Sequence, residues 1–161
     1  MTITTIIGDL LNSNDGMIAH CCNTRNTMNS GVAKALRVRF PEVYNEDTRA
    51  YIQHGKELLG KSIVVEVVTN PLDTNIKLVA NLYAQPNYGY DGNRYMNYEA
   101  FYQCLEELKK QALELKVTSI GMPYKIASDR AGGHWPIVLE MIKHIFADTD
   151  LNINLYKLDN L

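Results

Sequence analysis

Apolar residues along the chain follow two spacings, one typical of strands and one typical of helices. Short runs rich in β-branched residues predict strands at 2–7, 17–22, 62–68, 76–84, 117–123 and 151–158. Apolar residues that recur every three or four positions predict helices at 32–40, 42–55, 97–116 and 134–147. The helix starts agree with this reading, because Pro41 and Pro136 suit a first turn and Asn97 is a good N-cap residue.

The order of these elements, β-β-α-α-β-β-α-β-α-β, predicts an α/β fold. Strands that alternate with helices form a mainly parallel sheet with right-handed crossovers and helices on both faces. The segment 69–75 (TNPLDTN) is rich in turn residues, so the strands on either side of it are expected to form a hairpin. The sequence has no repeats or linkers, and we expect a single domain over 1–161.

Open sheets of this class bind ligands beyond the carboxyl ends of their strands. Three loops follow predicted strands and are expected to meet at that edge, namely 8–16, 23–31 and 124–133. The last two loops lead into helices, whose unpaired N–H groups and positive dipole end favour an anion.

Composition and charge restrict the kind of partner. The chain has 161 residues, of which 46% are hydrophobic and 21% charged, and its net charge is −2. This charge gives no reason to expect a nucleic-acid or membrane surface, so any phosphate binding must be local. A basic leader and an apolar run of about 18 residues are both missing, and we expect a cytoplasmic protein.

Cysteines and histidines suggest neither disulfides nor a metal. The three cysteines include an adjacent pair and no CxxC spacing, which is typical of reduced thiols. The four histidines are scattered without the spacing of metal ligands, so we expect no metal and no cofactor. The Walker, GxGxxG and GxSxG patterns are absent as well.

Polar residues that follow the first two predicted strands allow alternative roles. Asp9, between Gly8 and Leu10, can accept a hydrogen bond from a ligand amine or hydroxyl, or can be an ordinary turn residue. Asn23 can donate and accept hydrogen bonds at a ribose. His20 is either a buried histidine satisfied within the core or a candidate base.

Two further segments also have alternative readings. The turn at Asn29, Ser30 and Gly31 either cradles an anion or provides ordinary helix capping by Ser30. The tyrosines concentrated between Tyr83 and Tyr102 either stack on a base or pack against the long helix.

The stretch MPYKIASDRAGGHW, 122–135, places a charged pair at the centre of a small-residue loop. Asp129 could be a catalyst, a repulsive filter against anions, or a helix cap. Gly132 and Gly133 separate it from the helix, which makes capping the weakest of the three roles.

Taken in order, these pieces resemble the macrodomain family over nearly the whole chain. The resemblance rests on GDLL (8–11), IAHCCN (18–23), MNSGVAKAL (28–36), FPEVY (40–44), ANLYAQ (80–85), YGYDGNRYMNYEAF (88–101), MPYKI (122–126), AGGHW (131–135) and LYKL (155–158). Within the family, the chain is similar to small yeast and bacteriophage proteins identified as ADP-ribose 1″-phosphate phosphatases, which are related to terminal ADP-ribose–protein glycohydrolases. This resemblance implies a three-layer α/β/α sandwich with a mixed, mainly parallel central sheet.

The resemblance also implies a ligand, ADP-ribose or a derivative of it. Asp9, with Gly8 and Leu10 beside it, would bind the adenine amine, and Tyr156 would lie near the adenine. The implied partners are a small ADP-ribose derivative or an ADP-ribosylated protein, and neither nucleic acid nor a membrane.

By the same resemblance, two loops would hold the rest of the ligand. Asn23 and the turn 29–32 would hold the distal ribose and a phosphate, and the loop 126–133 would close over the diphosphate. The residues implied in these loops are Asn29, Ser30, Gly31, Val32, Ile126, Ala127, Ser128, Asp129 and Arg130.

The sequence departs from the family pattern in both phosphate loops. Relatives usually have glycine where Asn29 stands and frequently where Asn26 stands, and asparagine best tolerates the left-handed backbone that glycine allows. Relatives commonly read Gly-Cys-Gly-Leu at 127–130, where Asp129 now brings negative charge and Arg130 could offset it. In sequence, the distance from the aspartate-arginine pair to the tryptophan also differs by two residues from the distance in relatives.

A third departure lies at the end of the fourth predicted strand. The glycohydrolase relatives use a lysine there to form a covalent sugar intermediate, assisted by an aspartate of the second loop. This chain ends the strand with Tyr83-Ala84-Gln85 and has no lysine there.

We therefore expect a hydrolase acting on ADP-ribose 1″-phosphate or on an ADP-ribosyl ester. Asp129 would be the general acid or base, Asn23 would orient the distal ribose, and His20 is the reserve base. The first alternative is a non-catalytic macrodomain that binds or sequesters an ADP-ribose-type or NAD-derived nucleotide signal. The second is a protein-interaction scaffold that has lost nucleotide binding.

Overall fold

The computed structural model describes residues 1–68, 75–89, 93–129 and 131–159. Its strands are β1 (Thr2–Ile7), β2 (Met17–Asn23), β3 (Ser62–Glu66), β4 (Leu78–Gln85), β5 (Ser119–Pro123) and β6 (Asn152–Lys157). Its α-helices are α1 (Gly31–Arg39), α2 (Pro41–His54), α3 (Tyr98–Glu114) and α4 (Trp135–Phe146). All the predicted strands and helices are therefore present, with ends that differ by a few residues.

The strands form one six-stranded sheet in the order β1-β6-β5-β2-β4-β3. Neighbouring strands are parallel from β1 to β4, whereas β3 pairs antiparallel with β4. These pairings confirm the mixed, mainly parallel sheet and the predicted hairpin. The turn expected within that hairpin, 69–75, lies outside the described residues except for its last position.

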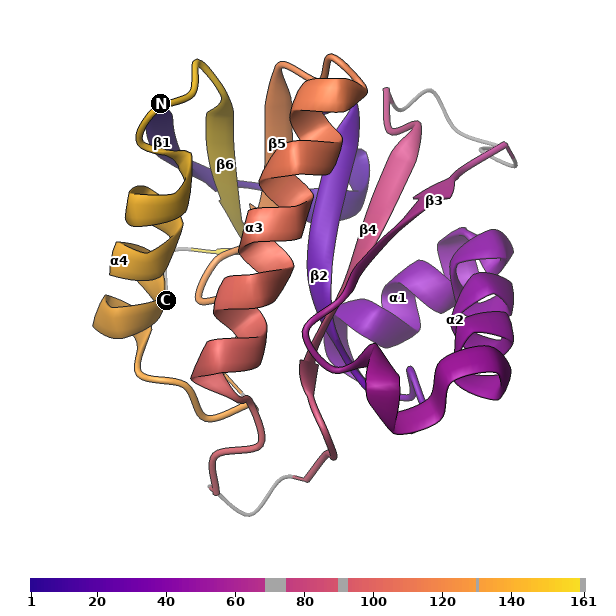
Figure 1. Cartoon of the computed structure of the whole chain (residues 1–161). Coiled ribbons are helices and arrows are strands. Elements are labelled where there is room, and N and C mark those ends of the chain that lie inside the picture. The colour runs from indigo at the N-terminus through magenta and orange to yellow at the C-terminus, as the bar shows by residue number, and fades with distance from the viewer. Residues whose placement is uncertain (69–74, 90–92, 130, 160–161) are drawn as a thin grey trace.

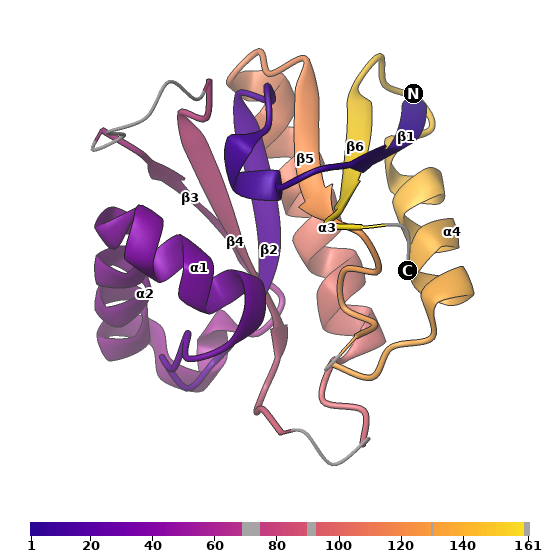
Figure 2. The same cartoon turned by 180° about the vertical axis from the view of Figure 1, so that it is seen from behind.

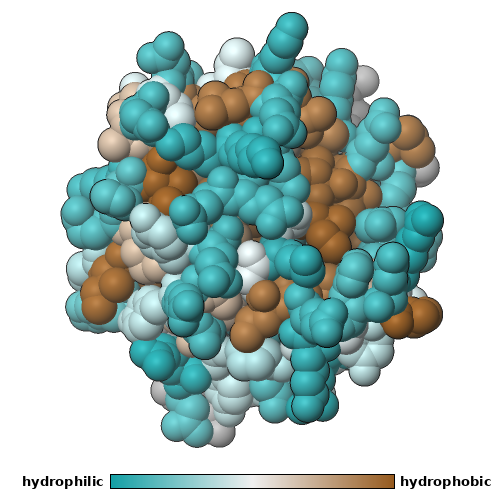
Figure 3. Space-filling model, viewed as in Figure 1, coloured by the Kyte–Doolittle hydropathy of each residue, from teal (hydrophilic) through white to brown (hydrophobic). Residues whose placement is uncertain are grey.

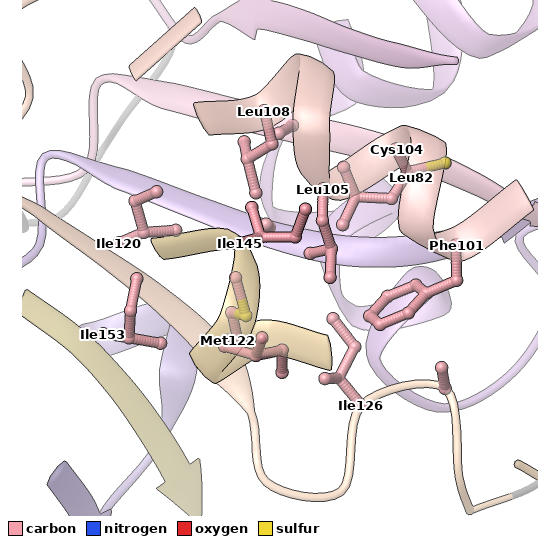
Figure 4. Packing of buried hydrophobic residues seen from close by; sticks show 14 of the residues in the cluster. Leu82, Phe101, Cys104, Leu105, Leu108, Ile120, Met122, Ile126, Ile145 and Ile153 are labelled. Carbon is pink, nitrogen blue, oxygen red and sulfur yellow. The ribbon is translucent and has the colours of Figure 1, made fainter. Parts of the chain in front are cut away.

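Helices cover both faces of the sheet, with α3 and α4 on one face and α1 and α2 on the other (Figure 1, Figure 2). The larger core fills the space under α3 and α4, where Phe101 and Leu105 of α3 lie near Met122 of β5 (Figure 4). A second core packs Leu36 of α1 and Val43 of α2 against the opposite face of the sheet. These layers confirm the three-layer α/β/α sandwich.

The helix α3 illustrates how local sequence and burial agree. The side chain of Asn97 accepts a hydrogen bond from the backbone N–H of Ala100 at 2.9 Å, which confirms the predicted N-cap. The buried positions recur every three or four residues and so form one apolar face: Ala100, Phe101, Cys104, Leu105, Leu108 and Ala112.

The loop expected at 8–16 contains a short 3-10 helix, η1 (Leu10–Asn12), which the sequence pattern does not reveal. The Asp9 carboxylate starts it by accepting a hydrogen bond from the backbone N–H of Leu11 at 3.0 Å. Leu10 and Leu11 are buried against the second core, so the apolar pair fixes this turn on the sheet. A second 3-10 helix, η2 (Gly55–Leu58), follows α2.

The surface on the α3 side is mainly hydrophilic, with hydrophobic patches between polar side chains (Figure 3). This distribution is expected when the apolar sides of helices face the sheet. Among the described residues, no helix is both long enough and apolar enough to span a membrane.

Candidate functional site

A cavity of about 760 Å³ opens at the edge of the sheet where the parallel strands end. Segments that lie far apart in the sequence line it, namely 8–11, 20–23, 27–33, 88–89, 123–127 and 156–158, with Ala35, Arg39, Asp47, Gln85, Asp129 and Ala131. Its volume lies within the range of small-molecule sites, roughly 300–1,000 Å³. The predicted edge of the sheet therefore carries a cavity of ligand size.

Most of the predicted site residues line this cavity. They are Gly8, Asp9, Leu10, His20, Asn23, Asn29, Ser30, Gly31, Val32, Ile126, Ala127, Asp129 and Tyr156. Ser128 belongs to the same loop, but it is not a lining residue, and its hydroxyl donates to the carbonyl of Ile126 at 3.3 Å. Arg130 lies outside the described residues.

Asp9 has the turn role that its sequence position allows, and it also lines the cavity. Its Oδ1 accepts from Leu11 N–H, as a turn residue would. The same residue is exposed and lines the cavity, so the carboxylate retains capacity for a ligand amine.

Asn23, at the end of β2, is tied into its own loop. Its Oδ1 accepts from the backbone N–H of Arg25 at 2.8 Å, and its Nδ2 donates to the hydroxyl of Thr27 at 2.7 Å. An amide has two N–H groups and two lone pairs, so one of each is left for a ligand. Asn23 is therefore held in a fixed orientation at the cavity wall.

The backbone of the loop 23–31 differs from expectation at one of its two asparagines. Asn26 has φ 57°, which confirms that it accommodates the left-handed conformation. Asn29 does not have a positive φ; Met28 adopts the left-handed conformation instead, with φ 43°. The side chain of Asn29 accepts a hydrogen bond from Arg37 Nη1 at 3.0 Å.

The start of α1, where the sequence predicts either an anion site or ordinary helix capping, lines the cavity. Ser30 precedes the helix, but its side chain makes no capping hydrogen bond to the described first turn. Ordinary capping by Ser30, the alternative reading of this turn, is therefore not observed. Gly31 has φ 58°, and a Cβ built there would meet no atom within 4 Å, so the backbone is open to the cavity.

The loop 124–133 lies across the cavity from α1. Lys125 and Ala127 both have left-handed backbones, with φ of 59° and 63°. Ala127 occupies the position where relatives commonly have glycine, which explains why glycine suits it. The carbonyl of Ala127 accepts from Gly133 N–H at 3.0 Å, and a Cβ on Gly133 would lie only 2.4 Å from that oxygen.

Asp129 lies in this loop as an exposed residue that lines the cavity. The N-cap position of α4 is His134, so Asp129 does not cap the helix. The helix-cap role is therefore excluded, and catalyst and charge filter both stay predictions.

His20 is buried in the floor of the cavity. Its Nε2 lies 2.6 Å from Oδ1 of Asn81, so the ring donates to the amide carbonyl. Burial lowers the pKa of His20 to about 4, although the hydrogen bond to Asn81 acts in the opposite direction. The ring is thus neutral near pH 7, and this geometry favours the buried, satisfied role over that of a base.

Cys22, next to His20 in space, has an unreactive environment. Its Sγ lies 3.5 Å from the Nε2 of His20, but burial raises the pKa of the Cys22 thiol well above its ordinary value. The thiolate needed for nucleophilic attack is therefore disfavoured.

Tyr156, on β6, lines the cavity near Gly8. Its hydroxyl donates to the Asp15 carboxylate at 2.7 Å, and Asn154 donates to the same carboxylate at 2.8 Å. Burial and the contact with Asp15 raise the pKa of Tyr156 to about 12. The ring, rather than the hydroxyl, is therefore the part of Tyr156 that a ligand can use.

The described tyrosines of the tyrosine-rich region mostly contact other parts of the protein and do not line the cavity. Tyr83 is fully buried, Tyr98 accepts from the backbone N–H of His134 at 2.9 Å, and Tyr102 stacks on His144 at 6.2 Å. Tyr88 is exposed and lines the cavity, whereas Tyr90 lies outside the described residues. Packing is therefore the main role of these tyrosines. Among those that the structure describes, Tyr88 is the one placed to contact a ligand in the cavity.

Several cavity residues were not expected from the sequence, chiefly Asp47, Gln85 and Lys125. Gln85 could have been found, because it ends β4 at the edge of the sheet where the sequence predicts a ligand. Asp47 lies in the middle of α2 and carries no local signal. Among the described residues, no group of His, Cys, Asp and Glu could hold a metal ion.

Comparison with known proteins agrees with this architecture. The profile of the family described as "Macro domain" matches residues 19–142. A search of curated protein sequences finds no match.

Similar solved structures extend over almost the whole chain. The macrodomain of Mycobacterium tuberculosis DarG is 21% identical, with a TM-score of 0.82, over 96% of this chain and 97% of that one. The macrodomain of Thermus aquaticus DarG is 23% identical, with a TM-score of 0.79, over 97% and 98% of the two chains. Thermosipho africanus DarTG, solved in complex with ADP-ribose, is 16% identical, with a TM-score of 0.80, over 96% of this chain and 41% of that one.

At these identities the structures establish the shared fold, and the family profile covers well over half of the sequence. The cavity also lies at the sheet edge that the fold predicts. The chain belongs to the macro domain family.

Proposed function

We propose that the chain binds ADP-ribose or a close derivative in the cavity at the carboxyl edge of the sheet. The observation that carries this proposal is the convergence of Asp9, Asn23 and the loop 124–133 on one cavity of about 760 Å³. The resemblance had implied these same segments for the adenine, the distal ribose and the diphosphate. The DarTG structure with bound ADP-ribose supports the choice of ligand.

The ligand would lie across the cavity with its adenine beside Asp9 and Tyr156. Its diphosphate would pass between the start of α1 at Gly31 and the loop at Ala127, and its distal ribose would reach Asn23. The described charged side chains that line the cavity balance one another: Asp9, Asp47 and Asp129 against Arg39, Lys125 and Lys157. Backbone N–H groups at the helix start would therefore provide much of the attraction for phosphate.

We further propose that the chain hydrolyses its ligand, as an ADP-ribose 1″-phosphate phosphatase or an ADP-ribosyl ester hydrolase. In the phosphatase reaction, water attacks phosphorus and the bond from phosphorus to the 1″ oxygen breaks, which releases ADP-ribose and inorganic phosphate. Asp129 would take a proton from the water and return one to the leaving oxygen, while Asn23 holds the ribose. The exposure of Asp129 at the cavity supports this role, because the side chain can reach a bound ligand.

Turnover by the wild type and by Asp129→Asn tests the proposed chemistry. We expect the variant to lose at least a hundredfold in kcat on the true substrate, because general acid–base groups contribute roughly 10²–10⁴-fold. ADP-ribose affinity should stay within a few fold, since the cavity shape is kept. Full activity of the variant on both ADP-ribose 1″-phosphate and an ADP-ribosyl ester would exclude Asp129 as the catalyst.

The second candidate function is binding or sequestration of an ADP-ribose-type nucleotide, or of an ADP-ribosylated protein, without chemistry. The end of β4 favours it, because the glycohydrolase relatives have a reactive lysine near this place, whereas β4 ends here with Gln85, which lines the cavity. Calorimetry combined with product analysis separates the candidates. Tight binding of ADP-ribose or a cyclic isomer with no product over hours would favour sequestration.

A further inference from the structure

A cluster of buried and half-buried polar side chains connects the sheet, α2 and the loop 23–31. We call it the Asp47 cluster; its members are Asn26, Asp47, Thr48 and Tyr83. Asp47 is 1% exposed and Tyr83 is fully buried, yet Asp47 is also one of the residues that line the cavity. The cluster therefore connects the packing of α2 to the wall of the site.

Both oxygens of the Asp47 carboxylate have a donor. The hydroxyl of Tyr83, on β4, donates to Oδ1 at 2.6 Å, and Nδ2 of Asn26 donates to Oδ2 at 2.8 Å. Transferring a carboxylate from water to the protein interior is costly unless hydrogen-bond donors replace the water. Asp47 thus holds one residue of the sheet and one residue of the loop at the same time.

Asn26 lies at the turning point of the loop. Its backbone is left-handed, with φ 57°, and its carbonyl accepts from the hydroxyl of Tyr44 at 3.4 Å. Thr27, the next residue, accepts a hydrogen bond from Asn23 at 2.7 Å, and both of these residues line the cavity. Asn26 is therefore anchored to α2, while Asn23 and Thr27 of the same loop line the cavity.

We propose that Asp47 and Asn26 are positioning residues for the distal sugar of the ligand, an inference that rests on the proposed binding of ADP-ribose. The Asp47 carboxylate fixes the side chain of Asn26, and this anchor sets the place of Asn23 and Thr27 at the cavity. The ligand does not need to touch Asn26. Without the anchor, the loop would remain chemically complete, but Asn23 would no longer be held at the sugar.

Asn26→Gly tests this inference, because glycine keeps the left-handed backbone at no steric cost but removes the side-chain anchor. We expect the affinity for ADP-ribose to fall at least tenfold by calorimetry. The affinity for ADP, which lacks the distal sugar, should change less than twofold. A general loss of folding would weaken both ligands alike, so this split separates positioning from stability.

Three further variants complete the experiment. Thr48→Val is the matched control: it removes the longer contacts to Asn26, at 3.1 and 3.3 Å, and should change neither affinity more than twofold. Asp47→Asn retains an oxygen that can accept from Asn26 and should preserve most of the ADP-ribose affinity, whereas Asp47→Ala should lose it.

Unchanged ADP-ribose affinity in Asn26→Gly, or an equal loss for ADP and ADP-ribose, would overturn the inference. Failure of Asp47→Ala to fold leaves the Asn26→Gly comparison decisive. If the wild type binds no ADP-ribose at all, the proposed function itself fails. If the wild type binds ADP-ribose and Asn26→Gly binds it equally well, only the positioning inference fails.

Discussion

At the residue scale, Tyr156 shows how one side chain can both shape the cavity and hold the fold. The residue lines the cavity, but its hydroxyl is bonded to the buried carboxylate of Asp15. Asp15 lies just before β2 and also accepts from Asn154 of β6. Tyr156 therefore ties the end of the loop 8–16, which carries Asp9, to β6.

Tyr156→Phe is expected to reduce stability and to spare binding. The free energy of unfolding should fall by about 1–2 kcal/mol, because a buried carboxylate loses one charge-assisted hydrogen bond. The ring remains, so ADP-ribose affinity should stay within threefold of the wild type. Urea denaturation and calorimetry measure the two effects; a tenfold loss of affinity in a variant of wild-type stability would show that the hydroxyl touches the ligand.

At the scale of elements, the loop 124–133 is held in place by the segment that leads into α3. The carbonyl of Ala131 accepts from the backbone N–H groups of Tyr95 and Met96, at 2.8 and 3.0 Å. Gly132 permits this close contact because it has no Cβ: its φ is 79°, and a Cβ there would lie 2.7 Å from the Cα of Arg94. The glycine pair at 132–133 thus fits the loop against the chain and does not itself line the cavity.

Gly132→Ala should displace this loop. We expect a loss of about 1–3 kcal/mol in the free energy of unfolding, from the left-handed backbone and the clash with Arg94, together with weaker ADP-ribose binding. Gly16→Ala is the matched control, since a Cβ there meets nothing within 4 Å, and it should change neither quantity appreciably. Equal behaviour of the two variants in denaturation and calorimetry would contradict this role of Gly132.

At the scale of the whole molecule, the sequence predicted the sheet, its helices and the edge at which the cavity opens. These features follow from local periodicity and from the rule for parallel sheets, as the N-cap at Asn97 illustrates. The Asp47 cluster could not be predicted in this way, because Asp47 meets Asn26 and Tyr83 across 21 and 36 residues of sequence. The left-handed backbone of Met28 also depends on the surrounding fold, since methionine has no local preference for it.

An NMR titration of the isotope-labelled chain with ADP-ribose tests the assignment of this cavity most directly, because it reports both affinity and location. We predict saturable shifts of the backbone amides of Asp9, Asn23, Gly31 and Ala127, which come from three loops but line one cavity. The amide of Gly60, which does not line that cavity, should stay unchanged. The absence of shifts at millimolar ADP-ribose, or shifts confined to the surroundings of Gly60, would contradict the assignment of ADP-ribose binding to this cavity.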